Sequence, residues 1–331
     1  MPSQSGRSRI VGTGAYAPER VVSNFDLAKI VDTSDEWITE RTGIKERRFV
    51  TDGQAASDLA YQASIRALDA ARLKPTDLDM IVVGTVSSDM RLPACAAFLQ
   101  NKLGAGPIPS FDVAAACAGF VYSLSVADQF IRTGALKTVL VVGTEVLSRI
   151  TNFADRNTCV LFGDGAGAVV LQHAEEGEAG VLSTSLHTDS SLATSLMVPA
   201  GGSLEPLTHE SLDAQRDKIY MNGQDIFKVA VRNLTSASRA AIAAAGLESA
   251  QIRWVVPHQA NLRIIAQVSQ RLAIPMDRFV LNIERYGNTS SASIPIALDE
   301  GVRDGRIGPG DTVLMCALGA GVSWASALIR M

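Results

Sequence analysis

Two segments in the first half of this sequence are echoed by two segments in the second half. LDMIVVGTVSS at Leu78–Ser88 resembles IRWVVPHQAN at Ile252–Asn261, and KTVLVVGTEV at Lys137–Val146 resembles DTVLMCALGA at Asp311–Ala320. Self-similarity at a distance of this kind indicates that one arrangement of strands and helices is used twice. A fold for this chain therefore has to place two similar units in one molecule.

We expect the two related halves to span residues 1–182 and 183–331. A polar stretch rich in Gly, Ser and Pro, Ser183–Asp217, is the natural place for the join and its loops. No sharp linker separates the halves, so we expect them to pack as one body.

Short runs rich in Val and Ile alternate with longer segments of helical periodicity. The predicted strands are Arg9–Gly12, Met80–Thr85, Val139–Gly143, Val169–Leu171, Trp254–Val256 and Val313–Cys316. The predicted helices are Ala55–Arg72, Gly119–Arg132, Gly223–Ala245 and Ala260–Leu272, with Gly or Pro as stop signals. This alternation predicts an α/β fold with layered sheets and helices.

Composition excludes several classes of protein. With 47% hydrophobic and 19% charged residues the chain is globular, and its net charge of -4 argues against nucleic acid as the main partner. No apolar run approaches the roughly 18 residues of a membrane span, and the opening MPSQSGRSR lacks the apolar region of a secretory signal. We therefore expect a cytoplasmic protein that binds no membrane. The four cysteines form no CxxC pair and no cluster with His, so neither a metal site nor a disulfide framework is expected.

The first candidate for chemistry is Cys117, in SFDVAAACAGF at Ser110–Phe120. An apolar strand meets a run of very small residues there, and a helix follows. Small neighbours let a substrate approach the sulfur, and a helix N-terminus stabilises a thiolate. The alternative is a buried cysteine in an alanine-rich core, and this segment alone does not decide between the two.

Two further motifs carry His258 and Asn288. His258, in VVPHQANLRI, directly follows a buried strand, and the C-terminal end of a strand faces the usual ligand crevice of an α/β sheet. Asn288, in ERYGNTSSASIP, lies in a loop rich in Gly and Ser ahead of another helix. Taken singly, such a histidine is more often structural and an Asn beside Gly usually marks a turn.

Together the three motifs resemble the Cys-His-Asn site of β-ketoacyl-acyl carrier protein synthase III, a condensing enzyme of the thiolase superfamily. The resemblance covers nearly the whole chain. Its supporting segments are Val31–Arg47, Phe162–Leu171, Val302–Asp311 and Leu318–Arg330. The resemblance implies a thiolase-like fold of two pseudo-duplicated halves.

It also implies a reaction that begins fatty-acid synthesis. Cys117 would attack an acyl-CoA thioester, release CoA and hold the acyl group. Malonyl-acyl carrier protein would then lose CO₂ and condense with that group, with His258 and Asn288 donating hydrogen bonds to the thioester oxyanion. The backbone N–H groups of Cys117 and Ala320 would form a second oxyanion hole, although the family usually has Gly at the position of Ala320.

The same resemblance assigns residues around the site. Those for CoA are Thr33, Trp37, Arg41, Arg156, Gly223 and Asn261. Those for the acidic carrier protein are Lys228, Gln259, Arg263 and Arg271. Leu92 would reach across a homodimer interface into the partner's acyl pocket, where acetyl-selective relatives place Phe. No cofactor is expected, because the CoA thioester is a substrate.

Other functions remain to be weighed. A related acyltransferase or condensing enzyme of secondary metabolism would use the same three residues. A thiolase would need a second catalytic cysteine, but Cys316 falls in an apolar strand and Asn288 stands where thiolases carry His. A catalytically idle acyl-CoA-binding protein would not need the nucleophile. Cys95, Cys159 and Cys316 lie in apolar sequence and are expected in the core.

Overall fold

A computed structural model describes residues 6–174 and 179–331. The first half forms a five-stranded sheet in the order β1-β7-β6-β4-β5. β4 runs parallel to β5 and β6, whereas β7 is antiparallel to both β6 and β1. The strands are β1 (Arg7–Tyr16), β4 (Met80–Gly84), β5 (Ser110–Val113), β6 (Thr138–Val146) and β7 (Asp164–Ala174).

The second half repeats this arrangement in a four-stranded sheet of order β11-β12-β13-β8. Its strands are β8 (Gly180–Thr188), β11 (Trp254–Pro257), β12 (Thr312–Gly319) and β13 (Ser323–Arg330). β11 is parallel to β12, and β13 is antiparallel to both its neighbours. An isolated parallel bridge from Val255 to Phe279 lies where β5 lies in the first sheet. The sequence echoes therefore correspond to β4 with β11 and β6 with β12.

The boundary expected after residue 182 falls inside β8, which pairs with β13 along its length. We propose that the division between the halves lies just before Gly180, because a strand belongs to the sheet in which it is hydrogen-bonded.

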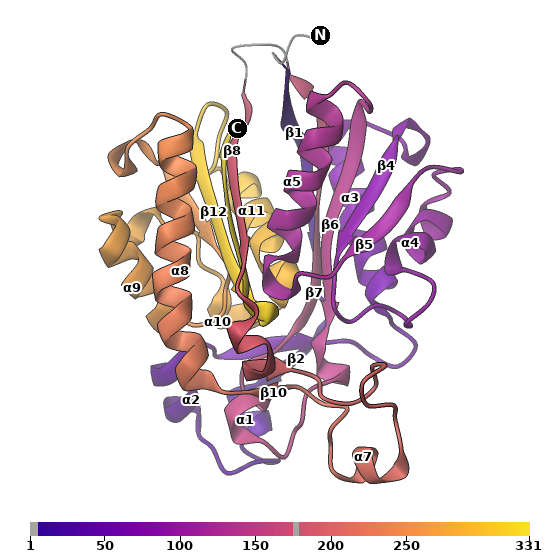
Figure 1. Cartoon of the computed structure of the whole chain (residues 1–331), viewed down its shortest axis with the longest axis vertical. Helices are drawn as coiled ribbons and strands as arrows, with labels where there is room; N and C mark the ends of the chain where they lie inside the picture. The colour runs from indigo at the N-terminus through magenta and orange to yellow at the C-terminus, as the bar shows by residue number, and fades with distance from the viewer. Residues whose placement is uncertain (1–5, 175–178) are drawn as a thin grey trace.

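Helices and sheets alternate in five layers (Figure 1). The outer helices α3 (Ala56–Ala71) and α4 (Cys95–Leu103) pack on the first sheet, and α8 (Gly223–Ala244) and α9 (Leu262–Leu272) pack on the second. The helices α5 (Gly119–Arg132) and α11 (Ser293–Arg303) lie between the sheets. The predicted α/β layering is confirmed.

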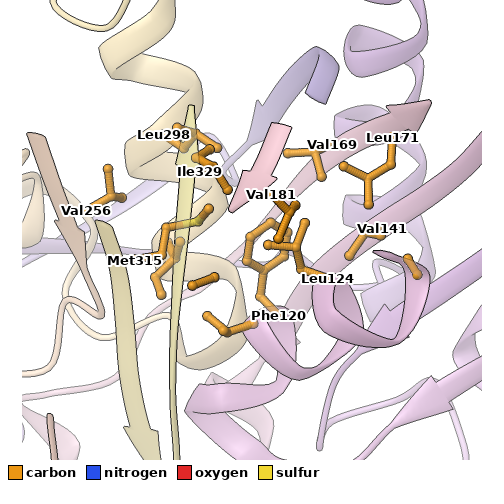
Figure 2. Close-up of a cluster of buried hydrophobic side chains, with 14 of the residues drawn as sticks. Phe120, Leu124, Val141, Val169, Leu171, Val181, Val256, Leu298, Met315 and Ile329 are labelled. Atoms are coloured by element: carbon orange, nitrogen blue, oxygen red, sulfur yellow. The ribbon is translucent and has the colours of Figure 1, made fainter. Parts of the chain in front are cut away.

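The central layer holds a continuous apolar core. Phe120 and Leu124 of α5 meet Val141 and Val169 of the first sheet and Met315 of the second (Figure 2). Strands such as β4 and β6 are buried along their whole length, because helices cover both of their faces. At one end of this core the start of α5 lies close to the turn before α11, since a Cβ on Gly119 would lie 3.4 Å from Cβ of Ser291.

The four helices predicted from periodicity are present. The predicted helix Ala260–Leu272 begins two residues later, at Leu262, because the side chain of Asn261 caps it by accepting a hydrogen bond from the N–H of Arg263 at 2.9 Å. Gly134 and Gly246 follow their helices with φ of 73° and 69°, a conformation that glycine adopts without strain.

Smaller elements cover the lower end of the molecule in Figure 1. They are β2 (Arg20–Ser23), β3 (Glu46–Phe49), β9 (Leu196–Met197), β10 (Tyr220–Met221), α1 (Asn24–Leu27), α2 (Asp35–Thr42), α6 (Arg156–Cys159), α7 (His209–Asp213) and α10 (Ile283–Tyr286). Short 3₁₀ turns include η2 (Ala116–Ala118), η7 (Ser290–Ala292) and η8 (Ala320–Val322). No helix in the described part of the chain is both long and apolar enough to cross a membrane.

Candidate active site

Cys117 lies in the tight turn η2, between β5 and the N-terminus of α5. Ala116 turns the chain with φ of 46°. The end of β12 presses against this turn, since a Cβ on Gly319 would lie 2.4 Å from the backbone nitrogen of Cys117. Only glycine permits this approach, which holds the nucleophile turn against the second half of the molecule.

The thiol of Cys117 does not have the lowered pKa that an exposed helix N-terminus would give it. Burial raises the pKa of its thiol to about 12, whereas the Ser290 side chain, a hydrogen-bond partner, lowers it. The thiol is therefore protonated at rest. Because desolvation outweighs the favourable partners, attack requires the proton to leave as the sulfur reacts.

His258 directly follows β11, and its N–H donates to the carbonyl of Cys316 at 2.8 Å. Its Nδ1 is 2.7 Å from Oγ of Ser293. Burial lowers the pKa of His258 to about 3, so the imidazole is neutral. Its other nitrogen, Nε2, remains for substrate.

Asn288 is fixed by its backbone between two segments. Its N–H donates to the carbonyl of Leu161 at 2.8 Å, and its carbonyl accepts from the N–H of Gly163 at 2.9 Å. The side-chain Oδ1 accepts from the N–H of Ser290 at 2.8 Å. This bond orients the amide so that its NH₂ group is left to donate.

Cys117, His258 and Asn288 line one cavity of about 250 Å³, which we call the active-site cavity. Of the other predicted residues it is lined by Trp37, Arg41, Gly223, Asn261 and Arg263. The guanidinium carbons of Arg41 and Arg156 lie 4.5 Å and 5.0 Å from the centre of the Trp37 ring. Thr33, near these residues in the chain, has a buried hydroxyl without a hydrogen-bond partner.

A second cavity, of about 280 Å³, meets the first at Cys117, and we call it the apolar cavity. Its lining includes Leu147, Ile150, Phe162, Leu196, Met197 and Ile219. Ala320 also lines it, in a 3₁₀ conformation outside the left-handed region, so Ala is accommodated there in place of Gly. Val86 and Val198 lie at its edge with 46% and 39% of their surface exposed.

The remaining predicted residues lie in different surroundings. Lys228, Arg263 and Arg271 are exposed on α8 and α9. Gln259 is buried: its amide donates to the carbonyls of Pro257 and Val280, and its Oε1 accepts from the N–H of Asn282. The prediction that Gln259 contacts a carrier protein is wrong, because its polar atoms face the interior.

Leu92 lies outside both cavities of its own chain, with 83% of its surface exposed.

The other three cysteines lie in the core, as predicted. Cys95 packs between α3, α4 and the first sheet, Cys159 behind α2, and Cys316 on the outer side of the second sheet. Burial raises the pKa of Cys159 to about 11 and of Cys316 to about 12. In the described residues, no group of three His, Cys, Asp or Glu is placed to hold a metal ion.

The prediction did not include three polar residues next to the site: Glu145, Ser290 and Ser293. The serines stand in NTSSASIP beside Asn288, in the loop described above as rich in Gly and Ser. Glu145 lies in an apolar strand, where a single acidic residue was a visible but unused signal of a buried partner.

Comparison with known proteins identifies the family of the chain. Residues 111–190 match the family described as 3-Oxoacyl-[acyl-carrier-protein (ACP)] synthase III, and residues 242–331 match its C-terminal part. The chain is 52% identical over 323 residues to Beta-ketoacyl-[acyl-carrier-protein] synthase III of Xanthomonas campestris pv. campestris, covering 98% of each chain.

A protein of the same name from Caldanaerobacter subterraneus subsp. tengcongensis is 50% identical over 321 residues, covering 97% of each chain. The crystal structure of 3-oxoacyl-[acyl-carrier-protein] synthase III from Aquifex aeolicus VF5 has a TM-score of 0.91 and 44% identity, over 98% of this chain and 100% of that one.

Proposed function

This chain belongs to the β-ketoacyl-[acyl-carrier-protein] synthase III family, and from that premise we propose that it joins an acyl-CoA primer to malonyl-acyl carrier protein. The products are 3-oxoacyl-acyl carrier protein, CoA and CO₂, in the condensation that initiates fatty-acid synthesis. The observation that carries the proposal is the convergence of Cys117, His258 and Asn288 on one cavity.

In the first half-reaction, Cys117 attacks the carbonyl carbon of the acyl-CoA thioester. The C–S bond to CoA breaks, CoA leaves as its thiol, and the acyl group becomes a thioester of Cys117. The oxyanion that forms in between accepts hydrogen bonds from the backbone N–H groups of Cys117 and Ala320. The helix N-terminus of α5 stabilises negative charge at the same place.

In the second half-reaction, the malonyl group loses CO₂ and the electron pair moves into its thioester carbonyl. Asn288 donates to this oxygen through its oriented amide. His258 donates through Nε2 in the tautomer whose Nδ1 accepts the Ser293 hydroxyl hydrogen, for which the carbonyl of Ser290, 2.8 Å from Ser293 Oγ, is the competing acceptor. The enolate carbon then attacks the acyl thioester and releases Cys117. Because His258 is buried and neutral, it contributes as a hydrogen-bond donor rather than as a cation.

The part of the active-site cavity that is lined by Trp37 suits the adenine end of CoA. A planar base stacks on an indole, and the two guanidinium groups on Trp37 supply positive charge for phosphates. Gly223 and Asn261, further along the lining, would border the pantetheine arm. Thr33 lines neither cavity and its hydroxyl is buried, so its side chain would have to rotate to donate to the nucleotide.

A positive surface on α8 and α9 for the acidic carrier protein is formed by Lys228, Arg263 and Arg271.

We predict that Lys228→Glu raises the KM for malonyl-acyl carrier protein about fivefold, which corresponds to the loss of roughly 1 kcal/mol from one exposed ion pair. Self-acylation of Cys117 should not change. Arg253→Glu makes the same change of charge just before β11, at the end of the strand away from His258, and is the control. Equal increases in the KM for malonyl-acyl carrier protein in both variants would contradict a local carrier surface.

We further propose a homodimer in which Leu92 closes the partner's apolar cavity. Leu92 is an exposed apolar side chain, and the cavity has an apolar edge at Val86 and Val198 that a second chain would cover. Leu is smaller than Phe, so the cavity floor should be deeper than in an acetyl-only enzyme.

The expected result is that primers longer than acetyl are accepted, each further buried CH₂ gaining up to about 0.8 kcal/mol. Acetyl-, butyryl-, isobutyryl- and hexanoyl-CoA should be compared in the wild type and in Leu92→Phe, which should disfavour the longer ones. If the wild type takes only acetyl, or if Phe leaves the relative rates unchanged, the geometry is wrong.

The reaction needs no metal or prosthetic group, because the thiol, the hydrogen-bond donors and the thioesters supply all of its chemistry. We place the protein in the cytoplasm with its substrates. The direct experiment is to incubate the protein with acyl-CoA and weigh the Cys117 adduct, then add malonyl-acyl carrier protein and measure CO₂. A condensing enzyme of secondary metabolism would acylate Cys117 but fail to turn over with malonyl-acyl carrier protein.

A further inference from the structure

Glu145 is a buried carboxyl group for which the reaction above has no use. It stands near the end of β6 with no exposed surface, in a strand that is otherwise apolar or small. An acidic side chain is costly to bury without a cation or a full set of donors. Its partners therefore indicate what it does.

The partners of Glu145 are hydroxyl and amide groups. Oε2 lies 3.2 Å from the N–H of Val86 and 3.3 Å from Oγ1 of Thr85, and it accepts from the Ser87 hydroxyl. Oε1 lies 3.0 Å from Oγ of Ser290 and 3.1 Å from Oγ of Ser291. None of these partners carries a positive charge.

The hydroxyl hydrogens at Oε1 can be assigned by counting. Ser291 has one hydroxyl hydrogen, and a carbonyl stands 2.6 Å away on Gly84 to accept it. Toward Glu145, Ser291 then offers only a lone pair, so a favourable contact requires a proton on Oε1. Burial raises the pKa of Glu145 and so favours this protonated form.

Ser290 also has one hydroxyl hydrogen and two possible acceptors. One is Oε1 of Glu145, and the other is the sulfur of Cys117, which lines the apolar cavity together with Ser290. If Glu145 is protonated and donates to Ser291, the Ser290 hydrogen is free for the sulfur. If Glu145 is ionised, its carboxylate takes that hydrogen, because a charged acceptor binds it more strongly.

We propose that Glu145 is a positioning residue for the nucleophile, which in its protonated form leaves the Ser290 hydroxyl to the sulfur of Cys117 and in its ionised form withdraws it. No covalent bond changes; one proton leaves Glu145 and one hydroxyl rotates. This inference rests on the proposed role of Cys117, and its test reads the thiol directly, without acyl-CoA.

The titratable groups around Glu145 supply no positive charge that would stabilise its carboxylate. Cys117 on η2 and Cys95 at the start of α4 are acids that its negative charge opposes. Asp89, before α4, and Asp164, on the neighbouring β7, are also acidic. His258, the basic group of the same site, is neutral. Ionised Glu145 therefore adds charge to an already acidic environment.

The experiment measures the rate at which iodoacetamide alkylates Cys117 from about pH 7 to about pH 10, with the site identified by peptide mass spectrometry. Below the pKa of the thiol this rate is proportional to the thiolate fraction, so a pKa lowered by about one unit raises the rate about tenfold. Glu145→Gln keeps the shape and cannot ionise, and we expect it to raise the rate about tenfold at pH values where Glu145 of the wild type is ionised. Ser290→Ala should lower the rate. In the Ser290→Ala background, Glu145→Gln should have a clearly smaller effect, because the Ser290 hydroxyl that connects the two groups is gone.

Two further variants keep the result interpretable. Asp128→Asn neutralises another buried carboxyl, further along α5, and should leave the alkylation rate of Cys117 unchanged. If Glu145→Gln does not fold, Ser87→Ala removes one donor from Oε2, disfavours the carboxylate and should raise the alkylation rate of Cys117. A Glu145→Gln profile that overlies the wild type, or single effects that simply add, would overturn the proposal. Normal profiles with no acylation by acyl-CoA would instead contradict the proposed function.

Discussion

Cys117→Ala should abolish acyl transfer from acyl-CoA, lowering the rate by a factor on the order of 10⁴ or more, while the protein still folds. The sulfur is the only atom removed, and it borders two cavities, so little packing is lost and the free energy of unfolding should fall by about 1 kcal/mol or less. Mass spectrometry after incubation with acyl-CoA measures the first effect and thermal unfolding the second.

Cys316→Ala is the matched control for this variant. Cys316 is equally buried, but it packs on the outer side of the second sheet, away from both cavities. It should acquire the acyl mass at Cys117 as the wild type does. An acyl mass increment on Cys117→Ala, or a label at Cys159, would show that the nucleophile has been misassigned.

His258→Ala and Asn288→Ala should separate the two half-reactions. Their donors are directed at the malonyl thioester, so each variant should lose on the order of a hundredfold or more in decarboxylation of malonyl-acyl carrier protein. Self-acylation of Cys117 should suffer less, because its oxyanion is held by backbone N–H groups. Release of CO₂ and the rate of the Cys117 mass increment measure the two steps, and equal losses in both would argue against this division.

The pH dependence gives a second readout of the same role. With the pKa of His258 lowered to about 3, its imidazole stays neutral throughout the working range. The decarboxylation rate of the wild type should therefore show no inflection near pH 6.5, the usual pKa of a histidine. An inflection there that disappears in His258→Ala would mean that the imidazole titrates during the reaction.

Much of the fold was predictable because the signals for it are local or repeated. The echo between β4 and β11 and between β6 and β12 predicted two similar halves before any strand order was known. Strands buried on both faces read as continuous Val and Ile runs. β13 was not predicted as a strand, since SWASALIR mixes small and polar residues and has no run of Val and Ile.

The site was predictable only through its motifs. His258 and its neighbour Gln259 look equally available in HQANLR, and only the packing of Pro257, Val280 and Asn282 shows that one faces the cavity and the other the interior. The apolar cavity draws on Leu147, Leu196 and Ile219 from segments far apart, which no local pattern connects. Three-dimensional packing decides such cases.

The meeting of the two cavities at Cys117 has a consequence for inhibitor design. Both are also lined by Phe162 and Leu196, so a ligand can pass from one to the other alongside the thiol. An inhibitor could carry an apolar group for the apolar cavity, a polar, anionic group for the active-site cavity, and an electrophilic atom between them. Bound in both cavities, it would present this atom to the sulfur of Cys117. Potency would then come from reversible occupancy of both cavities before any bond forms, and selectivity from the shape of the apolar group.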